Sequence, residues 1–463
     1  MKVALVSPPS EKGKYEHVKL SIPKMGIGYL AAVLESKGIE CDVIDAKFER
    51  LSMDDVRHRF AAGNFDVVGI SAMTAGIHSA GEVARAAKEM LPKCTTAVGG
   101  AHAIALPRRT MEEFDQFDVL ATGEGEITLP ELVYALDGGG SLDDVRGIVY
   151  RRDGRLEFTA DRDWIEQLDD IPFPAWHKYP RTASSYHVLA TRGCPYKCVF
   201  CQTILGKRVR KRSPENVVDE IAWLADEFKA TQFEFLDETF TADRRRAESI
   251  LDMLIDRGLN RRLRWNAQTR VDRVDDALFA KLKKAGCRQI EFGVESGNQD
   301  VLDTIEKRIT LEQVEKAVRL AKTAGLKVGC SFILGHPFET RETLQDTIDF
   351  LVKLNPDIAS VGIMIPLPGT KVYDMAINGE GNYIFEPTDW RDFLRFGGRG
   401  LELTNLSRHD LEKYQVKAYV SYYLKNFRVL DFMAYAYSHR RSAFELARKL
   451  MSNSSQSASR EVN

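Results

Sequence analysis

The sequence predicts an α/β protein built from two successive βα domains and a helical C-terminal region. Two observations favour this organisation. Short apolar, β-branched runs alternate with helical patterns over two long stretches of the chain. A Gly- and Pro-rich stretch between residues 137 and 176 separates them. The length of 463 residues also exceeds what one hydrophobic core organises, so several domains are expected.

Composition narrows the classes of function. The chain is 44% hydrophobic and 29% charged, as in ordinary globular proteins, and its formal net charge of -2 argues against nucleic-acid binding. No apolar run approaches the roughly 18 residues that span a bilayer, and the start lacks a signal-peptide pattern. The seven cysteines are an odd number, which does not favour a disulfide framework. We therefore expect a cytoplasmic protein without a transmembrane segment.

The first domain is expected to span residues 1–140 as a Rossmann-like, doubly wound parallel sheet. Apolar runs between helical patterns indicate strands that are buried on both faces. The expected strands are Lys2–Ser7, Cys41–Asp45, Val67–Ser71, Thr95–Val98 and Val119–Ala121. The expected helices are Gly28–Ser36, Met53–Ala62, Ala80–Leu91 and Arg109–Glu113. Several strands end in small residues, and ligands of open α/β sheets bind at that edge, where we expect a large cofactor.

A linker is expected over residues 141–180. Ile148–Tyr150 and Arg155–Thr159 flank Asp153-Gly154, which is typical of a hairpin. Ile171–Trp176 contains two prolines and is expected to be stiff and extended.

The second domain, residues 181–375, is expected to form a partial (β/α)6 TIM-like barrel. Six βα repeats are too few to close an eightfold barrel, and reactive residues should lie where strands end. The expected strands are Tyr186–Ala190, Gln232–Leu236, Arg264–Ala267, Gln289–Gly293, Lys327–Leu334 and Ser360–Ile365. The expected helices are Pro214–Phe228, Arg244–Arg257, Asp276–Ala285, Leu311–Ala324 and Arg341–Leu354.

The C-terminal region, residues 376–451, has helical periodicity in Arg408–Lys425 and Val429–Met451. Its aromatic and basic residues favour a helical lid over the open barrel, with a substrate entrance or a membrane contact as alternatives. The Ser-rich tail over residues 452–463 is expected to be disordered.

Three cysteines follow the first barrel strand at the spacing C-x3-C-x2-C, namely Cys194, Cys198 and Cys201. Thiolates are soft ligands that suit iron–sulfur clusters or zinc. Structural zinc normally takes four ligands, and no nearby histidine completes this set. Three thiolates on a four-iron cluster would leave one iron open to a substrate. The motif thus favours a [4Fe-4S] cluster, which Tyr196 and Phe200 could shield from water.

With this motif, residues 186–370 resemble the radical S-adenosylmethionine superfamily. The resemblance implies S-adenosylmethionine contacts at successive strand ends. Arg270 would pair with the methionine carboxylate, and Asp237-Glu238 would meet its amino group, although the family has Gly-Gly-Glu there. The full implied set is Asp237, Glu238, Gln268, Arg270, the ribose contacts Glu295 and Ser296, and Gly335 and Pro337 beside the adenine.

The first domain resembles the cobalamin-binding domain that precedes the radical core in one subgroup. It shares a Pro-Pro turn, a Gly-x-Gly-Tyr-Leu-Ala helix start, Gly-Ile-Ser, Gly-Gly and Gly-Glu-Gly-Glu. The implied cobalamin contacts are Ser71, Thr74, Gly99, Gly100, Gly123, Glu124 and Gly125. The D-x-H-x-x-G motif of histidine-ligated cobalamin proteins is missing and His17 does not replace it, so cobalamin without a histidine ligand is expected. A degenerate domain retained for packing is the alternative.

The resemblance implies an enzyme that reductively cleaves S-adenosylmethionine to a 5'-deoxyadenosyl radical and methylates an unactivated carbon through cobalamin. A ring-forming or rearranging enzyme with the same cofactors is the first alternative, and a non-catalytic corrinoid carrier or redox sensor is the second. A methylthiotransferase is disfavoured because the first domain lacks a further cysteine set. Expected partners are a small-molecule or natural-product substrate and an electron donor such as flavodoxin or ferredoxin.

Overall fold

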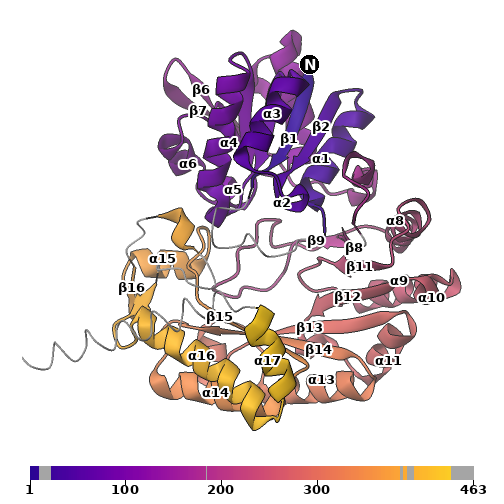
Figure 1. Ribbon diagram of the computed structural model, residues 1–463, viewed down its shortest axis with the longest axis vertical. Coiled ribbons are helices and arrows are strands. Elements are labelled where there is room, and N and C mark those ends of the chain that lie inside the picture. The colour runs from indigo at the N-terminus through magenta and orange to yellow at the C-terminus, as the bar shows by residue number, and fades with distance from the viewer. Residues whose placement is uncertain (10–21, 184, 386–388, 394–400, 439–463) are drawn as a thin grey trace, which may run out of the picture.

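The chain folds into two α/β bodies that lie one above the other in the computed structural model (Figure 1). The structure describes residues 1–9, 22–183, 185–385, 389–393 and 401–438. The N-terminal body comes first in the chain, the barrel follows, and the last helices pack on the side of the barrel.

The first sheet has the strand order β2-β1-β3-β4-β5-β6-β7 and is parallel from β2 to β5. All five strands predicted for it are present. The strands are β1 Lys2–Ser7, β2 Glu40–Asp45, β3 Val67–Ser71, β4 Thr95–Gly99, β5 Val119–Ala121, β6 Ile148–Arg152 and β7 Arg155–Phe158. The helices are α1 Met25–Ser36, α2 Ala46–Glu49, α3 Met53–Gly63, α4 Ile77–Met90, α5 Ala101–Ala105, α6 Pro107–Glu113 and α7 Gly125–Tyr134, with the 3-10 turn η1 Thr74–Gly76.

The hairpin that we placed in the linker is part of this first sheet. β6 pairs antiparallel with β5, and β7 pairs with β6. The reason is apolar burial, because Ile148, Val149 and Tyr150 of β6 are all almost fully buried between β5 and β7. The first body therefore extends beyond residue 140 and includes β7.

The second sheet contains six parallel strands in the order β15-β14-β13-β12-β11-β8, as predicted for the partial barrel. Its strands are β8 Ser185–Val188, β11 Gln232–Phe235, β12 Arg264–Thr269, β13 Cys287–Glu295, β14 Lys327–Leu334 and β15 Ile358–Ile363. Its helices are α8 Pro214–Glu227, α9 Arg244–Asp256, α10 Leu259–Arg262, α11 Asp276–Lys284, α12 Gln299–Thr304, α13 Leu311–Thr323 and α14 Arg341–Leu354.

Side-chain caps fix where the long barrel helices begin. The residue before each of these helices accepts a hydrogen bond from a backbone N–H in the first turn, which satisfies one of the free donors there. These capping residues are Ser213, Asp243, Asp275, Thr310 and Thr340. Such caps mark helix starts in the sequence, and the predicted starts agree with them.

The proline-containing linker joins the two bodies through a shared apolar core. Trp176 is almost fully buried, and its ring meets Tyr186 of β8 edge-on at 5.3 Å. Tyr179 donates to the Lys24 carbonyl at 2.7 Å, just before α1. A Cβ on Gly28 would lie 3.1 Å from Pro174, so the linker approaches α1 where that helix lacks a side chain. Apolar contact therefore holds the two bodies in one arrangement.

The C-terminal helices cover the free edge of the barrel. α16 (Arg408–Lys425) matches its predicted bounds and packs on α14 and β15. Gln415 and Tyr419 bond to the backbone of Val361 in β15, so the helix satisfies groups of an edge strand. α15 spans Lys371–Ile377 and α17 spans Val429–Ser438. The rest of the predicted helix to Met451 and the tail lie outside the described residues. No helix among the described residues has the length and apolar character needed to cross a bilayer.

Candidate cofactor site between the two bodies

The three cysteines lie on one loop between two short strands. β9 (Thr191–Arg192) pairs antiparallel with β10 (Arg210–Lys211), and residues 193–209 form the loop. Gly193 has φ +91°, and a Cβ there would lie 2.3 Å from the Arg208 carbonyl. Only glycine therefore allows the loop to close at this point. The Cys194 N–H donates to the Gly206 carbonyl at 3.1 Å, which fixes the first thiol near the base of the loop.

The three thiols differ in burial, and their surroundings raise the pKa of each. Accessibility rises from buried Cys194 through half-buried Cys198 to exposed Cys201. Burial raises the pKa of Cys194 and Cys198. Neighbouring protein atoms raise the pKa of Cys201 to about 12, with the charges of Cys198 and Cys194 as further causes, even though part of the residue reaches solvent. Such thiols become thiolate ligands when a metal displaces their protons.

Two cations, Arg270 and Lys307, lie beside this loop. The Arg270 guanidinium lies over the Tyr196 ring at 3.8 Å, and its charge opposes the effect of burial on the pKa of Cys194 and Cys198. Its Nε donates to Asp272 at 2.9 Å and its Nη2 donates to the Lys307 carbonyl at 2.9 Å. The guanidinium predicted to bind the methionine carboxylate is therefore held rigidly next to the cysteines.

Asp237 and Glu238 have different environments. Asp237 is fully buried and accepts hydrogen bonds from the Ala190 N–H at 3.0 Å and from the Thr191 hydroxyl. In this structure its carboxylate joins β9 to the end of β11, and its contact with methionine stays a prediction. The Glu238 Oε2 is buried and has no hydrogen-bond partner among the described residues. Burial raises the pKa of Glu238, and its charge acts on Cys194 and Cys201. Glu238 thus suits an ammonium group.

Glu295 lies at a strained point of the fourth barrel strand. Its φ is +72°, and the pairing of β13 with β14 shifts between Gly293 and Glu295. Its Oε1 accepts a hydrogen bond from the Lys307 ammonium at 2.7 Å. A Cβ on Gly293 would lie 2.3 Å from that carboxylate, so glycine makes room for the pair. Lys307 was not predicted, since it belongs to no motif and comes from the loop after α12.

The remaining predicted residues of the barrel fall into two groups. Ser296 is fully buried, shares a hydrogen bond with the Thr347 hydroxyl at 3.1 Å and accepts one from the Asn298 N–H at 3.2 Å. Its hydroxyl holds the turn after β13 on α14, and its ribose contact stays a prediction. Gln268 is exposed at the end of β12, and its side chain remains available to a ligand.

The turn after β14 is held by a buried carboxylate. Glu339 Oε2 accepts hydrogen bonds from the backbone N–H groups of Gly335 and His336, the latter at 3.0 Å. Gly335 has φ +90°, which only glycine adopts readily. His336 is fully buried, burial lowers its pKa to about 4, and its Nδ1 has no partner among the described residues. The centre of the neutral His336 ring lies 5.9 Å from that of Phe200 in the cysteine loop, and the neighbouring Pro337 is also buried.

An apolar cavity of about 260 Å³ lies at the carboxyl edge of the first sheet. Most residues predicted to contact cobalamin line it, as do Ile204 and Leu205 of the cysteine loop. The predicted residues that line it are Ser71, Gly99, Gly100, Gly123, Glu124 and Gly125. Gly123 has no atom within 4 Å of where a Cβ would lie, so its lack of a side chain leaves open space. The residues present fit a large ligand with an apolar body.

Thr74 and Glu124 differ in their relation to the cavity. Thr74 does not line the cavity, but it is buried on η1 and its hydroxyl lacks a partner among the described residues. Glu124 lines the cavity, while its carboxylate binds Arg192 and Arg210 of the barrel body at 2.7 Å each. The contact of Glu124 with cobalamin stays a prediction, and its carboxylate is paired with the two arginines.

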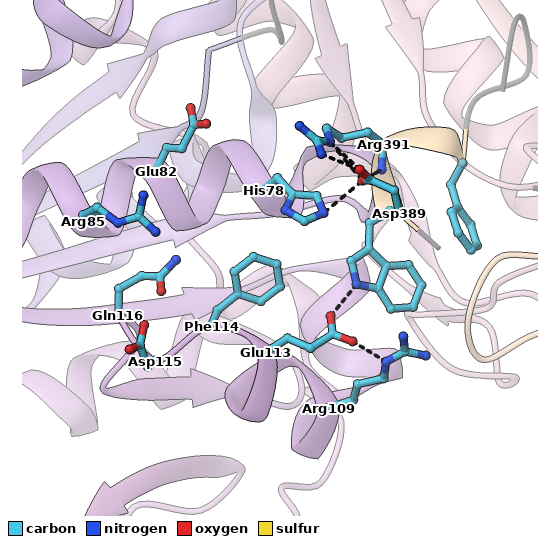
Figure 2. Close-up of a pocket in the computed structure, with 12 residues that line it drawn as sticks. His78, Glu82, Arg85, Arg109, Glu113, Phe114, Asp115, Gln116, Asp389 and Arg391 are labelled. Atoms are coloured by element: carbon cyan, nitrogen blue, oxygen red, sulfur yellow. Dashed lines mark hydrogen bonds and ion pairs between the residues drawn. The ribbon is translucent and has the colours of Figure 1, made fainter. Parts of the chain in front are cut away.

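A second cavity of about 530 Å³ lies between α4, α6 and the segment Asp389–Phe393 (Figure 2). Asp389 lies 3.1 Å from the His78 imidazole, and the Trp390 indole donates to Glu113 at 2.6 Å. The Trp390 ring also meets His102 at 4.7 Å, just beyond Gly99 and Gly100. No local pattern predicts this cavity, because its two walls are about 280 residues apart in the chain.

The other cysteines are packed thiols. Cys287 and Cys330 are buried in β13 and β14, as predicted. Among the described residues, no three His, Cys, Asp or Glu side chains are grouped to hold a single metal ion. His17 lies outside the described residues.

Comparisons with known proteins agree with this geometry. The radical SAM superfamily matches residues 188–351, and the B12 binding domain matches residues 15–133. The chain is 35% identical to an uncharacterized methyltransferase from Pyrococcus horikoshii, over 92% of this chain and 93% of that protein. It is 33% identical to the anaerobic magnesium-protoporphyrin IX monomethyl ester cyclase of Rubrivivax gelatinosus, over 81% of this chain and 69% of the cyclase.

A solved structure shows the same fold. The radical S-adenosylmethionine methyltransferase TsrM from Kitasatospora setae, with cobalamin and a [4Fe-4S] cluster bound, superposes with a TM-score of 0.73. The match covers 92% of this chain and 88% of TsrM at 18% identity.

Proposed function

Since the chain belongs to the radical S-adenosylmethionine superfamily and carries a B12-binding domain, we propose that it methylates an unactivated carbon of a small-molecule substrate. Its cofactors are a [4Fe-4S] cluster, S-adenosylmethionine and cobalamin. One observation carries the proposal, namely that the loop with the three cysteines also forms a wall of the apolar cavity. The proposed cluster site and the proposed cobalamin site would thus adjoin.

The residues of the barrel can bind and orient S-adenosylmethionine next to the cysteines. Cys194, Cys198 and Cys201 would hold three irons and leave the fourth open. Glu238 would accept hydrogen bonds from the methionine ammonium, and Arg270 would pair with its carboxylate. The fixed carboxylate of Glu295 suits the ribose hydroxyls. When bound, the cofactors supply one-electron cleavage of a sulfonium and a transferable methyl group.

Burial lets the protein keep water away from this chemistry. Tyr196 lies against Arg270, and Phe200 lies against His336 and 5.9 Å from the Lys307 ammonium. These contacts pack the cysteine loop against residues of the barrel. Exclusion of water strengthens each charged contact with the bound cofactor and protects a reactive intermediate.

Cyclisation with the same cofactors is the second candidate, because the match to the ester cyclase covers 81% of this chain. Methyl transfer is favoured because the match to the methyltransferase from Pyrococcus horikoshii covers nearly the full length of both proteins. A non-catalytic carrier or sensor is not favoured, since the chain is a radical SAM enzyme.

Product analysis separates the two candidates. The reduced, anaerobic holoenzyme is incubated with methyl-labelled S-adenosylmethionine and a small-molecule extract of the source cells. Methyl transfer predicts both 5'-deoxyadenosine and S-adenosylhomocysteine, together with a labelled product. Cyclisation predicts 5'-deoxyadenosine without S-adenosylhomocysteine, and that result would contradict the proposal.

A flavodoxin or ferredoxin is proposed as the electron donor, since reductive cleavage requires a low-potential electron. The cytoplasmic location stays a prediction from the cysteine content.

A further inference from the structure

One carboxylate of the N-terminal body holds both ends of the cysteine loop. Arg192 lies two residues before Cys194, and Arg210 begins the strand that closes the loop. Glu124 Oε1 accepts from Arg192 at 2.7 Å, and Glu124 Oε2 accepts from Arg210 at 2.7 Å. The pairing of β9 with β10 places the two arginines next to each other, within reach of a single side chain.

These ion pairs are buried and their charges are balanced. The side chains of Glu124, Arg192 and Arg210 are 3%, 6% and 2% exposed. Glu126 supplies the second anion, 2.6 Å from Arg192. Burial alone would raise the pKa of Glu124, but the hydrogen bonds from Arg210 and Arg192 outweigh it and the pKa is lowered.

Aromatic rings and a backbone donor complete the network. Tyr29 of α1 lies 5.4 Å from the Arg192 guanidinium, and Trp164 lies 5.1 Å from that of Arg210. The Ile165 N–H donates to Glu124 at 2.8 Å. Arg210 also donates to the Leu205 carbonyl inside the cysteine loop at 2.9 Å. Each group has a fixed position, so a shift of the Glu124 backbone must move the ends of the loop or break buried charge pairs.

The chain segment that carries Glu124 also lines the apolar cavity. Gly123 and Gly125 flank Glu124, and all three residues line that cavity together with Leu205. A ligand in the cavity therefore contacts the chain segment whose side chain holds the cysteine loop.

We propose that Glu124 is a positioning residue that couples occupancy of the cobalamin cavity to the geometry of the cysteine loop. The inference rests on the proposed positions of the two cofactor sites and not on the identity of the reaction. It predicts that cobalamin alters the cluster site without contacting it, and that S-adenosylmethionine binding responds to cobalamin.

Glu166 offers a matched control. It pairs with Arg208 of the same loop, but their side chains are 54% and 70% exposed. An exposed pair contributes little to rigidity. Glu166→Gln thus removes an acidic partner of the cysteine loop without disturbing the buried network.

The test compares wild type, Glu124→Gln and Glu166→Gln as full-length, anoxically reconstituted proteins. S-adenosylmethionine affinity and the EPR spectrum of the dithionite-reduced cluster are measured with and without hydroxocobalamin. In wild type and Glu166→Gln, hydroxocobalamin should change both the S-adenosylmethionine affinity and the EPR spectrum. The ratio of S-adenosylmethionine affinities with and without hydroxocobalamin should be smaller by about fivefold or more in Glu124→Gln than in wild type. Each cofactor should still bind to this variant alone.

Three results would overturn the proposal: no effect of cobalamin in wild type, equal coupling in both variants, or loss of coupling in Glu166→Gln. If Glu124→Gln does not fold, hydrogen exchange of the wild-type protein tests the coupling instead. Hydroxocobalamin should slow exchange in residues 193–209 and leave α11 unchanged, and equal exchange in the loop would contradict the coupling. A wild type without a cluster would instead refute the proposed cysteine site, which separates the two failures.

Discussion

At the scale of single residues, loss of charge at Glu238 and at Asp237 should have different effects. The first should weaken S-adenosylmethionine binding, and the second should lower the stability of the fold. Glu238→Gln should weaken S-adenosylmethionine binding by about tenfold or more, because a charge-assisted hydrogen bond to an ammonium is lost. Its unpaired, buried Oε2 makes no contact that stabilises the fold among the described residues, so stability should change little. Equilibrium dialysis of the reconstituted protein measures the affinity.

Asp237→Asn is the matched comparison for that prediction. Because Asp237 accepts from Ala190 and Thr191, its change should lower the free energy of unfolding by about 1–3 kcal/mol. S-adenosylmethionine affinity of the folded variant should stay close to wild type. If Glu238→Gln binds S-adenosylmethionine as wild type does, the assignment of Glu238 is wrong.

At the scale of elements, the turn between β14 and α14 should make stability depend on pH. Burial raises the pKa of Glu339 from 4.5 to about 8, so folding takes up a proton between these values. The contribution of Glu339 to stability should therefore be fully present below pH 4.5 and fall as the pH rises toward 8, by up to about 1.4 kcal/mol per pH unit. Glu339→Gln should remove this loss, because a neutral amide can still accept from Gly335 and His336. Melting temperatures at pH 5.5 and 8.5 test this.

Glu342→Gln is the control for the turn, since this carboxylate lies exposed in the first turn of the same helix. It should leave the loss of stability toward pH 8 in place. If the stability of Glu339→Gln depends on pH as that of wild type does, Glu339 is ionised in the folded protein.

Local sequence signals predict some of the elements and miss others. Predicted strands and capped helices agree with the structure because their signals are local, such as apolar runs and Thr340 or Ser213 before a helix. α7 was not predicted, since it begins with glycine and contains Pro130, both poor helix signals. The cysteine motif was recognised from its spacing, whereas the role of Glu238 is implied by the family resemblance and stays a prediction. Lys307 could not be found, because it reaches Glu295 through packing that no local pattern encodes.

At the scale of the whole molecule, the segment Asp389–Phe393 should fasten the C-terminal region to the N-terminal body (Figure 2). Trp390 is 4% exposed and packs on His102 and Phe393 while bonding to Glu113. Trp390→Ala should lower the melting temperature by about 5 °C or more through the lost burial. Phe427→Ala, at a ring that is 92% exposed, should have no such effect. Equal melting temperatures for the two variants would contradict this fastening role.

The central claim is that three thiolates hold a [4Fe-4S] cluster, and metal analysis of anoxically purified protein tests it most directly. Wild type and Cys94→Ala, a change in a buried thiol of the first body, should contain about four irons per chain and absorb near roughly 400 nm. Cys198→Ala should lose both features while remaining folded. Zinc in place of iron, or an unchanged iron content in Cys198→Ala, would contradict the account.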